Sequence, residues 1–229
     1  MIPKIIHQTW EGRKEPLPDF QKQLGETWKQ HHPAWQYEFW DGDRMEALVN
    51  NNYPRLKDVC LNFPYDVQRW DFLRYLILYK MGGMYVDFDY ECLASFDNYI
   101  SENKCCFAME PEEHRRAFQK ETLFNNALMI APPGHPFFET IITHIQTTPI
   151  TYTGKKMYDL LVLSGPMMLT NLYETCKDKN AICFLPAELV SPWSKNEVQR
   201  LINKTADMEE LEMKLEKAIA IHYFFGTWM

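Results

Sequence analysis

Two aspartates, Asp87 and Asp89, stand one residue apart in the stretch KMGGMYVDFDYE, residues 80–91. The apolar residues after the glycine pair predict a short buried strand over residues 84–86. Residues i and i+2 of an extended chain point to the same side, so both carboxylates can converge beyond the strand end, where open α/β sheets bind ligands. Their oxygens suit Mn²⁺ or Mg²⁺ shared with substrate phosphates. The alternative is a pair of turn residues without a ligand.

A second charged pair, Asp71 and Arg74, lies within a predicted helix over residues 65–80. This helix is apolar around nearly its whole circumference, which is typical of a buried helix. The pair shares a stripe with Val67 and Leu78, and buried charges are costly unless they are paired or bind something. Two interpretations stay open. The pair could fix the helix, or Arg74 could face phosphates or sugar while Asp71 faces a sugar hydroxyl.

The elements that must position these residues alternate between strands and helices, which predicts a three-layer α/β/α domain. The predicted strands cover residues 2–7, 35–40, 84–86, 105–110, 126–132, 181–186 and 218–224. The predicted helices cover residues 20–31, 43–50, 65–80, 135–146, 156–163, 166–176 and 206–216.

The composition fits one sizeable α/β domain over residues 1–229, because 46% of the residues are hydrophobic. A formal charge of −7 argues against nucleic acid as the main partner. The chain start lacks the pattern of a signal peptide, and no apolar run approaches the roughly 20 residues of a membrane span. The six cysteines show no CxxC spacing, so we expect reduced thiols in a cytoplasmic protein. His32 and His114 have no partner spacing and are expected at the surface.

Five segments occur in a distinctive order: IPKIIHQTW, RWDFLRYLILYKMGGMYVDFDYE, FNNALMIAPPGHPFF, LSGPMMLT and IHYFFGTW. Through them the chain resembles glycosyltransferase family 32, the DXD-containing sugar transferases, which include fungal α-1,6-mannosyltransferases and bacterial capsule and lipopolysaccharide enzymes. The pattern D-x-x-R-Y followed by G-G-x-Y-x-D-x-D is specific. The resemblance implies a GT-A fold, meaning a single Rossmann-like domain with a mixed central sheet. It also implies a divalent metal, Mn²⁺ or Mg²⁺, a nucleotide-sugar donor and transfer with retention of configuration.

The resemblance further implies roles for residues at matching positions. Trp10 ends the first strand, where relatives stack the nucleotide base, although a core aromatic is the alternative. Asp71 and Arg74 match the D-x-x-R residues that hold the donor sugar and phosphates. Asn126 and the turn at residues 164–166 are weaker candidates for lining the donor or acceptor pocket.

The DXD aspartates and the C-terminal motif are implied to hold metal and diphosphate. Asp87 matches the first carboxylate, which touches ribose, sugar or metal, and Asp89 matches the second, a direct metal ligand. His222 and Trp228 match the closing H-x-x-x-x-x-W element, which completes the metal and diphosphate site. A lone histidine such as His222 is otherwise more often a satisfied, half-buried residue.

The predicted function is retaining, metal-dependent transfer of a hexose, with galactose or glucose favoured, from a UDP-sugar to a glycan or glycolipid acceptor. Such an enzyme would serve bacterial capsule, lipopolysaccharide or glycolipid synthesis. A lipid-linked acceptor would bring it peripherally to the inner membrane face through Phe224, Phe225 and Trp193. Two alternatives are a nucleotide-sugar-binding module without turnover and an aspartyl-nucleophile phosphatase. The phosphatase pattern needs Thr or Val where this chain has Glu91.

Overall fold

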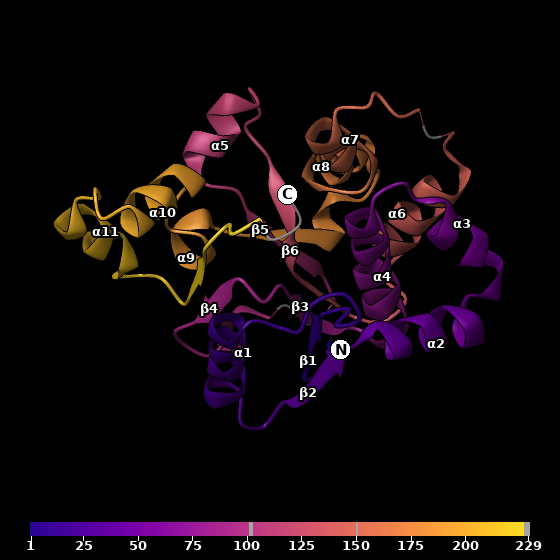
Figure 1. Ribbon diagram of the computed structural model, residues 1–229, viewed down its shortest axis with the longest axis horizontal. Helices are drawn as coiled ribbons and strands as arrows, with labels where there is room; N and C mark the ends of the chain where they lie inside the picture. The colour runs from indigo at the N-terminus through magenta and orange to yellow at the C-terminus, as the bar shows by residue number, and fades with distance from the viewer. Residues whose placement is uncertain (101–102, 150, 227–229) are drawn as a thin grey trace.

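The computed structural model describes residues 1–100, 103–149 and 151–226. A six-stranded sheet with the order β2-β1-β3-β6-β5-β7 lies at its centre (Figure 1). Its strands are β1 (Ile5–Thr9), β2 (Gln36–Trp40), β3 (Gly83–Val86), β5 (Cys105–Met109), β6 (Phe124–Ala131) and β7 (Ile182–Leu185). Strand β6 is antiparallel to both of its neighbours, and the other pairs are parallel. The predicted α/β fold with a mixed central sheet is therefore confirmed.

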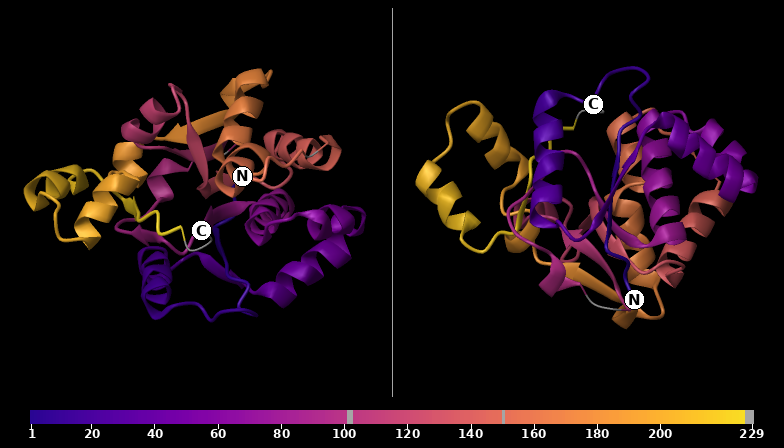
Figure 2. Two further views of the ribbon diagram at one scale, coloured as in Figure 1. Left: turned by 45° about the horizontal axis from the view of Figure 1, so that its top comes forward. Right: turned by 90° about the horizontal axis from the view of Figure 1, so that it is seen from below.

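A second, two-stranded sheet pairs β4 (Tyr90–Cys92) with β8 (Ala220–His222). The helices are α1 (Asp19–His31), α2 (Gly42–Asn52), α3 (Lys57–Asn62), α4 (Asp66–Met81), α5 (Glu112–Ala117), α6 (Pro136–Thr147), α7 (Lys156–Leu163), α8 (Pro166–Thr175), α9 (Ala187–Val190), α10 (Lys195–Ile202) and α11 (Met208–Leu215). The right-hand view of Figure 2 shows α1 on one side of the central sheet and α2 and α4 on the other.

The two faces of the sheet belong to two separate hydrophobic clusters. On β3, Tyr85 packs in the cluster that contains Phe72 of α4, whereas Met84 and Val86 pack in the cluster that contains Trp28 of α1. Successive side chains of a strand point to opposite faces. A strand that is buried on both faces must be apolar throughout, which explains the uninterrupted run before the first aspartate.

Glycines are required where α4 turns into β3. Gly82 ends the helix at a φ of +65°, and Gly83 follows at +96°. A Cβ atom on Gly83 would lie 2.6 Å from the carbonyl oxygen of Ile5 on the neighbouring strand, so β1 and β3 could not approach as they do. His7 reinforces this junction. Its Nε2 lies 2.9 Å from Gly82 O, and its Nδ1 accepts the indole N–H of Trp40 at 3.1 Å.

The element prediction misses several short segments. Strand β1 begins at Ile5 rather than Ile2 and extends to Thr9. The elements that were not predicted are β4, α3, α5, α9 and α10. All are between three and eight residues long, too short for a clear hydrophobic period.

The prediction that all cysteines are reduced is wrong. Cys106 on β5 and Cys183 on β7 form a disulfide. The two residues are register partners on neighbouring strands, with their Cα atoms 4.5 Å apart. Their separation of 77 residues hides this proximity from the sequence. The remaining thiols, Cys60, Cys92, Cys105 and Cys176, are free.

Two other residues expected at the surface are buried. Trp193 is 6% exposed and packs with Val198 and Leu211, so it is not available for the membrane contact expected of it. His32 is 2% exposed, and its Nε2 accepts the backbone N–H of Phe96 at 2.9 Å. Within the described residues, every helix is too short or too polar to cross a membrane.

Candidate functional site

The DXD turn, residues 87–89, lies directly between β3 and β4. The N–H of Asp87 donates to Ala127 O on β6 at 2.8 Å, and the N–H of Tyr223, just after β8, donates to Asp89 O at 2.9 Å. The turn is thus fixed by the large sheet on one side and by the C-terminal segment on the other. The Asp87 and Asp89 side chains stay 29% and 15% exposed, so both carboxylates can reach a ligand.

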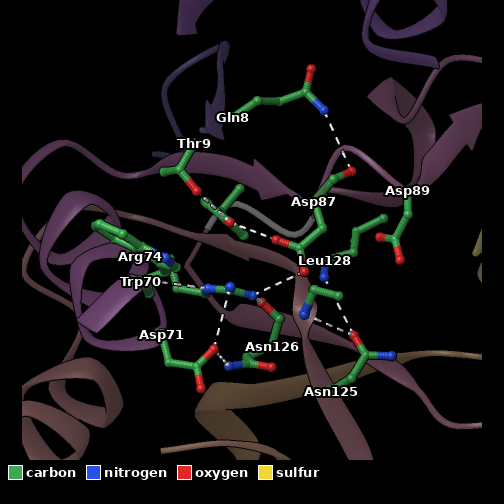
Figure 3. A network of polar contacts seen from close by, with 12 residues as sticks. Gln8, Thr9, Trp70, Asp71, Arg74, Asp87, Asp89, Asn125, Asn126 and Leu128 are labelled. Carbon is green, nitrogen blue, oxygen red and sulfur yellow. Dashed lines mark hydrogen bonds and ion pairs between the residues drawn. The ribbon is translucent and has the colours of Figure 1, made fainter. Parts of the chain in front are cut away.

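Arg74 of α4 connects two acidic residues of the site, Asp71 and Asp87 (Figure 3). Its Nη1 donates to Asp87 Oδ2 at 3.1 Å and to the carbonyl oxygen of Asn126 at 3.0 Å, and its Nη2 lies 3.3 Å from Asp71 Oδ1. Its guanidinium lies over the Tyr85 ring at 4.8 Å. Asp71 and Arg74 therefore do form an ion pair within the helix, as one of the two interpretations expects. Arg74 also contacts Asp87 of the DXD turn.

Asp71 is held by hydrogen bonds to both of its carboxylate oxygens. Asn126 Nδ2 donates to Oδ1 at 2.8 Å, and Ser164 Oγ donates to Oδ2 at 2.7 Å. Asn126 and Ser164, the weaker candidates for lining the pocket, therefore fix the position of the Asp71 carboxylate. Burial raises the pKa of Asp71 to about 6, with Arg74 opposing the shift.

The two DXD carboxylates lie in different environments. Asp87 accepts the Tyr85 hydroxyl at 2.6 Å, and burial raises its pKa, with Arg74 opposing and Asp89 adding to the shift. Burial also acts to raise the pKa of Asp89, but His222 and the N–H of Phe225 outweigh it, and the net shift is downward. Asp89 is therefore the more persistent anion of the two.

The predicted metal ligands form an incomplete set. His222 Nε2 lies 3.4 Å from Asp89 Oδ1, and its ring stacks on Tyr90 with centroids 4.2 Å apart. Nowhere in the described part of the chain do three His, Cys, Asp or Glu side chains converge to hold an ion by themselves. Carboxylates with one imidazole still fit a divalent ion whose remaining ligands are substrate phosphates. Trp228 lies outside the described residues.

Two cavities meet at the DXD turn. The first, of about 490 Å³, is lined by Trp10, Glu15, Lys14 and Lys156 among others. The second, of about 340 Å³, lies beside Asp71, Asn126 and His222. Both are lined by Val67, Arg74, Asp87, Asp89 and Gly226. Two compartments joined at charged residues suit a reaction between two different molecules.

Trp10 lies in the wall of the first cavity and not in the core. Its indole N–H donates to the carbonyl oxygen of Glu15 at 2.9 Å, and its side chain is partly exposed. The core alternative for Trp10 is therefore wrong. His222 is buried rather than half-buried, at 6% exposure, and its Nε2 lies beside Asp89, so its role as a metal ligand stays a prediction.

Sequence reasoning missed four polar residues that line the second cavity: Glu110, His114, Asn125 and Lys195. His114 was expected at the surface, but its Nδ1 lies 2.6 Å from Glu110 Oε2. A signal was present for Asn125, which precedes Asn126 in a strand that is otherwise apolar. Buried polar residues in an apolar strand indicate a functional edge.

Comparisons with known proteins agree with this arrangement. A family described as "glycosyltransferase sugar-binding region containing DXD motif" matches residues 18–106. Inositol phosphoceramide mannosyltransferase 1 of Schizosaccharomyces pombe is 31% identical over 180 residues, which cover 77% of this chain. The chain spans about half of that relative, 52% of its length.

Two solved structures share the fold. The PaToxG glycosyltransferase superposes with a TM-score of 0.53 at 17% identity, covering 94% of this chain and 76% of that one. The ligand-free glycosyltransferase domain of the YGT toxin gives a TM-score of 0.54 at 10% identity and 80% coverage of each chain. The predicted GT-A fold is thereby confirmed. Residues 18–106 therefore belong to the sugar-binding region of the DXD-containing glycosyltransferases, the family that the motifs resemble.

Proposed function

We propose that the protein transfers a hexose from a nucleotide-sugar to a hydroxyl group of a glycolipid or glycan, with divalent metal and with retention of configuration. The observation that carries the proposal is the junction of the two cavities at Arg74, Asp87 and Asp89. A donor in the first cavity and an acceptor in the second would bring their reacting atoms together there.

The first cavity suits the nucleotide diphosphate. Trp10 offers an aromatic face for the base, and Lys14 and Lys156 add positive charge along the wall. A divalent ion held by Asp89, with His222 and Asp87, would neutralise charge on the diphosphate leaving group. Arg74 is positioned to stabilise the same charge.

In the proposed step, the bond between the sugar C1 and the phosphate oxygen breaks, and a bond from C1 to the acceptor oxygen forms on the same face. The acceptor hydroxyl proton passes to the departing phosphate oxygen. Asp71, fixed by Asn126 and Ser164, would orient the donor sugar hydroxyls.

The sugar and the acceptor follow from the relatives rather than from the site. The yeast relative is named a mannosyltransferase, which favours mannose over the galactose or glucose expected from the sequence, so GDP-mannose is the first donor to test. A glycolipid acceptor is favoured by the same name and by the walls of the second cavity. Phe118 and Met157, at 42% and 41% exposure, supply apolar surface there.

A donor panel tests the proposal directly. The purified protein is incubated with UDP-glucose, UDP-galactose and GDP-mannose, with and without Mn²⁺, and nucleotide release is measured with and without inositol phosphoceramide in detergent micelles. We expect one donor to release nucleotide only with metal, and faster with acceptor. Donor binding without release would instead support the binding-module alternative. No release and no binding with any donor would overturn the proposal.

A further inference from the structure

Glu110 presents a carboxylate to the second cavity that neither the donor site nor the metal site uses. It follows β5 directly, is 7% exposed, and has its Oε2 2.6 Å from His114 Nδ1. The Nε2 atom of His114 accepts the backbone N–H of Lys195 at 3.0 Å. Because Nε2 accepts, the proton of the neutral ring lies on Nδ1 and is donated to Glu110. Within the described residues, Glu110 Oε1 makes no hydrogen bond.

Asn125 presents the opposite kind of group to the same cavity. It is 3% exposed, and its Oδ1 accepts the N–H groups of Ala127 at 3.1 Å and Leu128 at 3.4 Å. These two bonds fix the amide orientation, so Nδ2 points the other way, out of the network in Figure 3. Among the described residues, no hydrogen bond of good geometry reaches this buried Nδ2, although the Tyr90 side chain lies near enough to interact with the amide. Buried amide donors are rarely left unpaired, so a ligand is expected here.

The backbone places these two groups near the same end of the antiparallel β5–β6 pair. The N–H of Glu110 donates to Leu123 O at 2.9 Å, which sets Glu110 opposite Leu123. Asn125 is two residues beyond Leu123, where the pairing of β5 with β6 becomes irregular, and it lines the same cavity as Glu110. A fixed acceptor and a fixed donor thus share the cavity wall.

We propose that Glu110 and Asn125 form a subsite for the sugar or polyol head group of the acceptor, and this proposal rests on the function proposed above. Glu110 Oε1 accepts a hydrogen bond from one acceptor hydroxyl, and Asn125 Nδ2 donates to another. His114 is a positioning residue, because one of its ring nitrogens pairs with Glu110 and the other with the Lys195 N–H, which leaves neither for the ligand. A site of this kind rejects acceptors that lack the hydroxyls, since its buried groups would then stay unpaired.

The test reverses the hydrogen-bonding sense of each group with little change in shape. In Glu110→Gln, His114 Nδ1–H keeps the side-chain oxygen, so an NH₂ group replaces Oε1 in the cavity. In Asn125→Asp, the Ala127 and Leu128 amides keep Oδ1, so an oxygen replaces Nδ2. The matched control is Glu113→Gln on α5, the helix that carries His114, because Glu113 contacts Ser194 and Asn196 but does not line either cavity.

Three quantities are measured for each variant: kcat/KM for inositol phosphoceramide in micelles, donor hydrolysis without acceptor, and the Kd for the donor nucleotide. We expect Glu110→Gln and Asn125→Asp each to lower the acceptor kcat/KM roughly ten- to a hundredfold, mainly through KM. Hydrolysis and nucleotide Kd should stay at wild-type values. The control should behave as wild type in all three.

An acceptor kcat/KM within about twofold of wild type in both variants overturns the subsite. A loss of donor hydrolysis as large as the loss in acceptor kcat/KM also overturns the subsite, because the two residues would then act on the donor and not on the acceptor. Binding of myo-inositol, followed by ligand-observed NMR, gives a readout that needs no turnover: binding by wild type and its loss in Glu110→Ala support the subsite, and equal binding by both overturns it. If the wild type hydrolyses and binds no donor, the proposed function fails instead.

Discussion

The backbone N–H of Phe225 donates to Asp89 Oδ2 at 3.1 Å, so the second DXD aspartate is held by a residue 136 positions later in the chain. His222 lies 3.4 Å from the other carboxylate oxygen. A metal ion that binds Asp89 must therefore share or displace these partners. Metal binding and the position of the C-terminal segment are expected to be coupled.

The clearest test of the metal ligands is Asp89→Asn. The variant keeps an oxygen for the Phe225 N–H but loses the negative charge, so metal-dependent nucleotide release should fall by roughly a hundredfold or more. Release is measured against Mn²⁺ concentration, with the exposed Asp178→Asn as the control. Wild-type release without a metal requirement in Asp89→Asn would contradict the assignment.

Removal of Arg74 should cost stability as well as activity. Arg74→Met leaves Asp71 and Asp87 without their buried counter-ion, and we expect the free energy of unfolding in urea to fall by roughly 3–5 kcal/mol. Arg116→Met removes an ion pair whose arginine is 76% exposed. This control should change the free energy of unfolding by less than about 1 kcal/mol.

Arg74→Lys separates the two effects. Lysine keeps the charge but cannot bridge Asp71 and Asp87 as the guanidinium does. This variant should retain most of the stability lost in Arg74→Met while nucleotide release falls roughly a hundredfold. Equal activity of Arg74→Lys and wild type would show that charge alone is sufficient.

Nucleotide binding tests the role of Trp10. If its indole stacks on the base, Trp10→Ala should raise the Kd for UDP or GDP by roughly tenfold or more, since one base–aromatic stack is worth about 1–3 kcal/mol. Trp10→Phe keeps an aromatic face and should lie much closer to wild type. Isothermal titration calorimetry measures both Kd values. An unchanged Kd in Trp10→Ala would show that the base does not stack on Trp10.

His7 should contribute a loss of stability on mild acidification, against the opposite contribution of Asp71, whose pKa is raised. Burial lowers the pKa of His7 to about 4, from a usual value of 6.5, with the Gly82 carbonyl opposing the shift. Between these values the unfolded chain binds a proton that the folded chain does not, so stability is lost as the pH drops from 6.5 to 4. The loss from this group is about 3 kcal/mol.

A variant isolates this contribution from other titrating groups. His7→Gln can still pair with Trp40 and Gly82 but does not titrate, so it should lose less stability than the wild type as the pH falls across this window. The exposed His31→Gln should keep the wild-type dependence. The same pH slope in wild type and His7→Gln would refute the prediction.

Local patterns made the centre of the site predictable. The glycine pair, the apolar strand and the buried helix are contiguous in sequence, and they correctly position Asp71, Arg74, Asp87 and Asp89 together. The capping box at the start of α10, in which Ser194 and Glu197 bind each other's backbone, is likewise a local pattern, S-x-x-E, that predicts a helix start.

Long-range pairs could not be predicted in the same way. The disulfide joins residues 77 positions apart, and the bond from His114 Nε2 to the Lys195 N–H spans 81. Neither spacing has a local signature. Glu110 follows a strand, as the DXD aspartates do. It has no second carboxylate two residues away, so the sequence around it contains no recognisable motif.

The pairing of β4 with β8 has a consequence for synthesis on the ribosome. Tyr90 is in register with His222, so one partner is made long before the other. The DXD turn of a nascent chain has no β8 beside it until nearly the whole described sequence has emerged. A nascent chain that ends before residue 220 would therefore lack His222 and the Phe225 N–H at Asp89, so the proposed donor site would be complete only once residues 220–225 have been made.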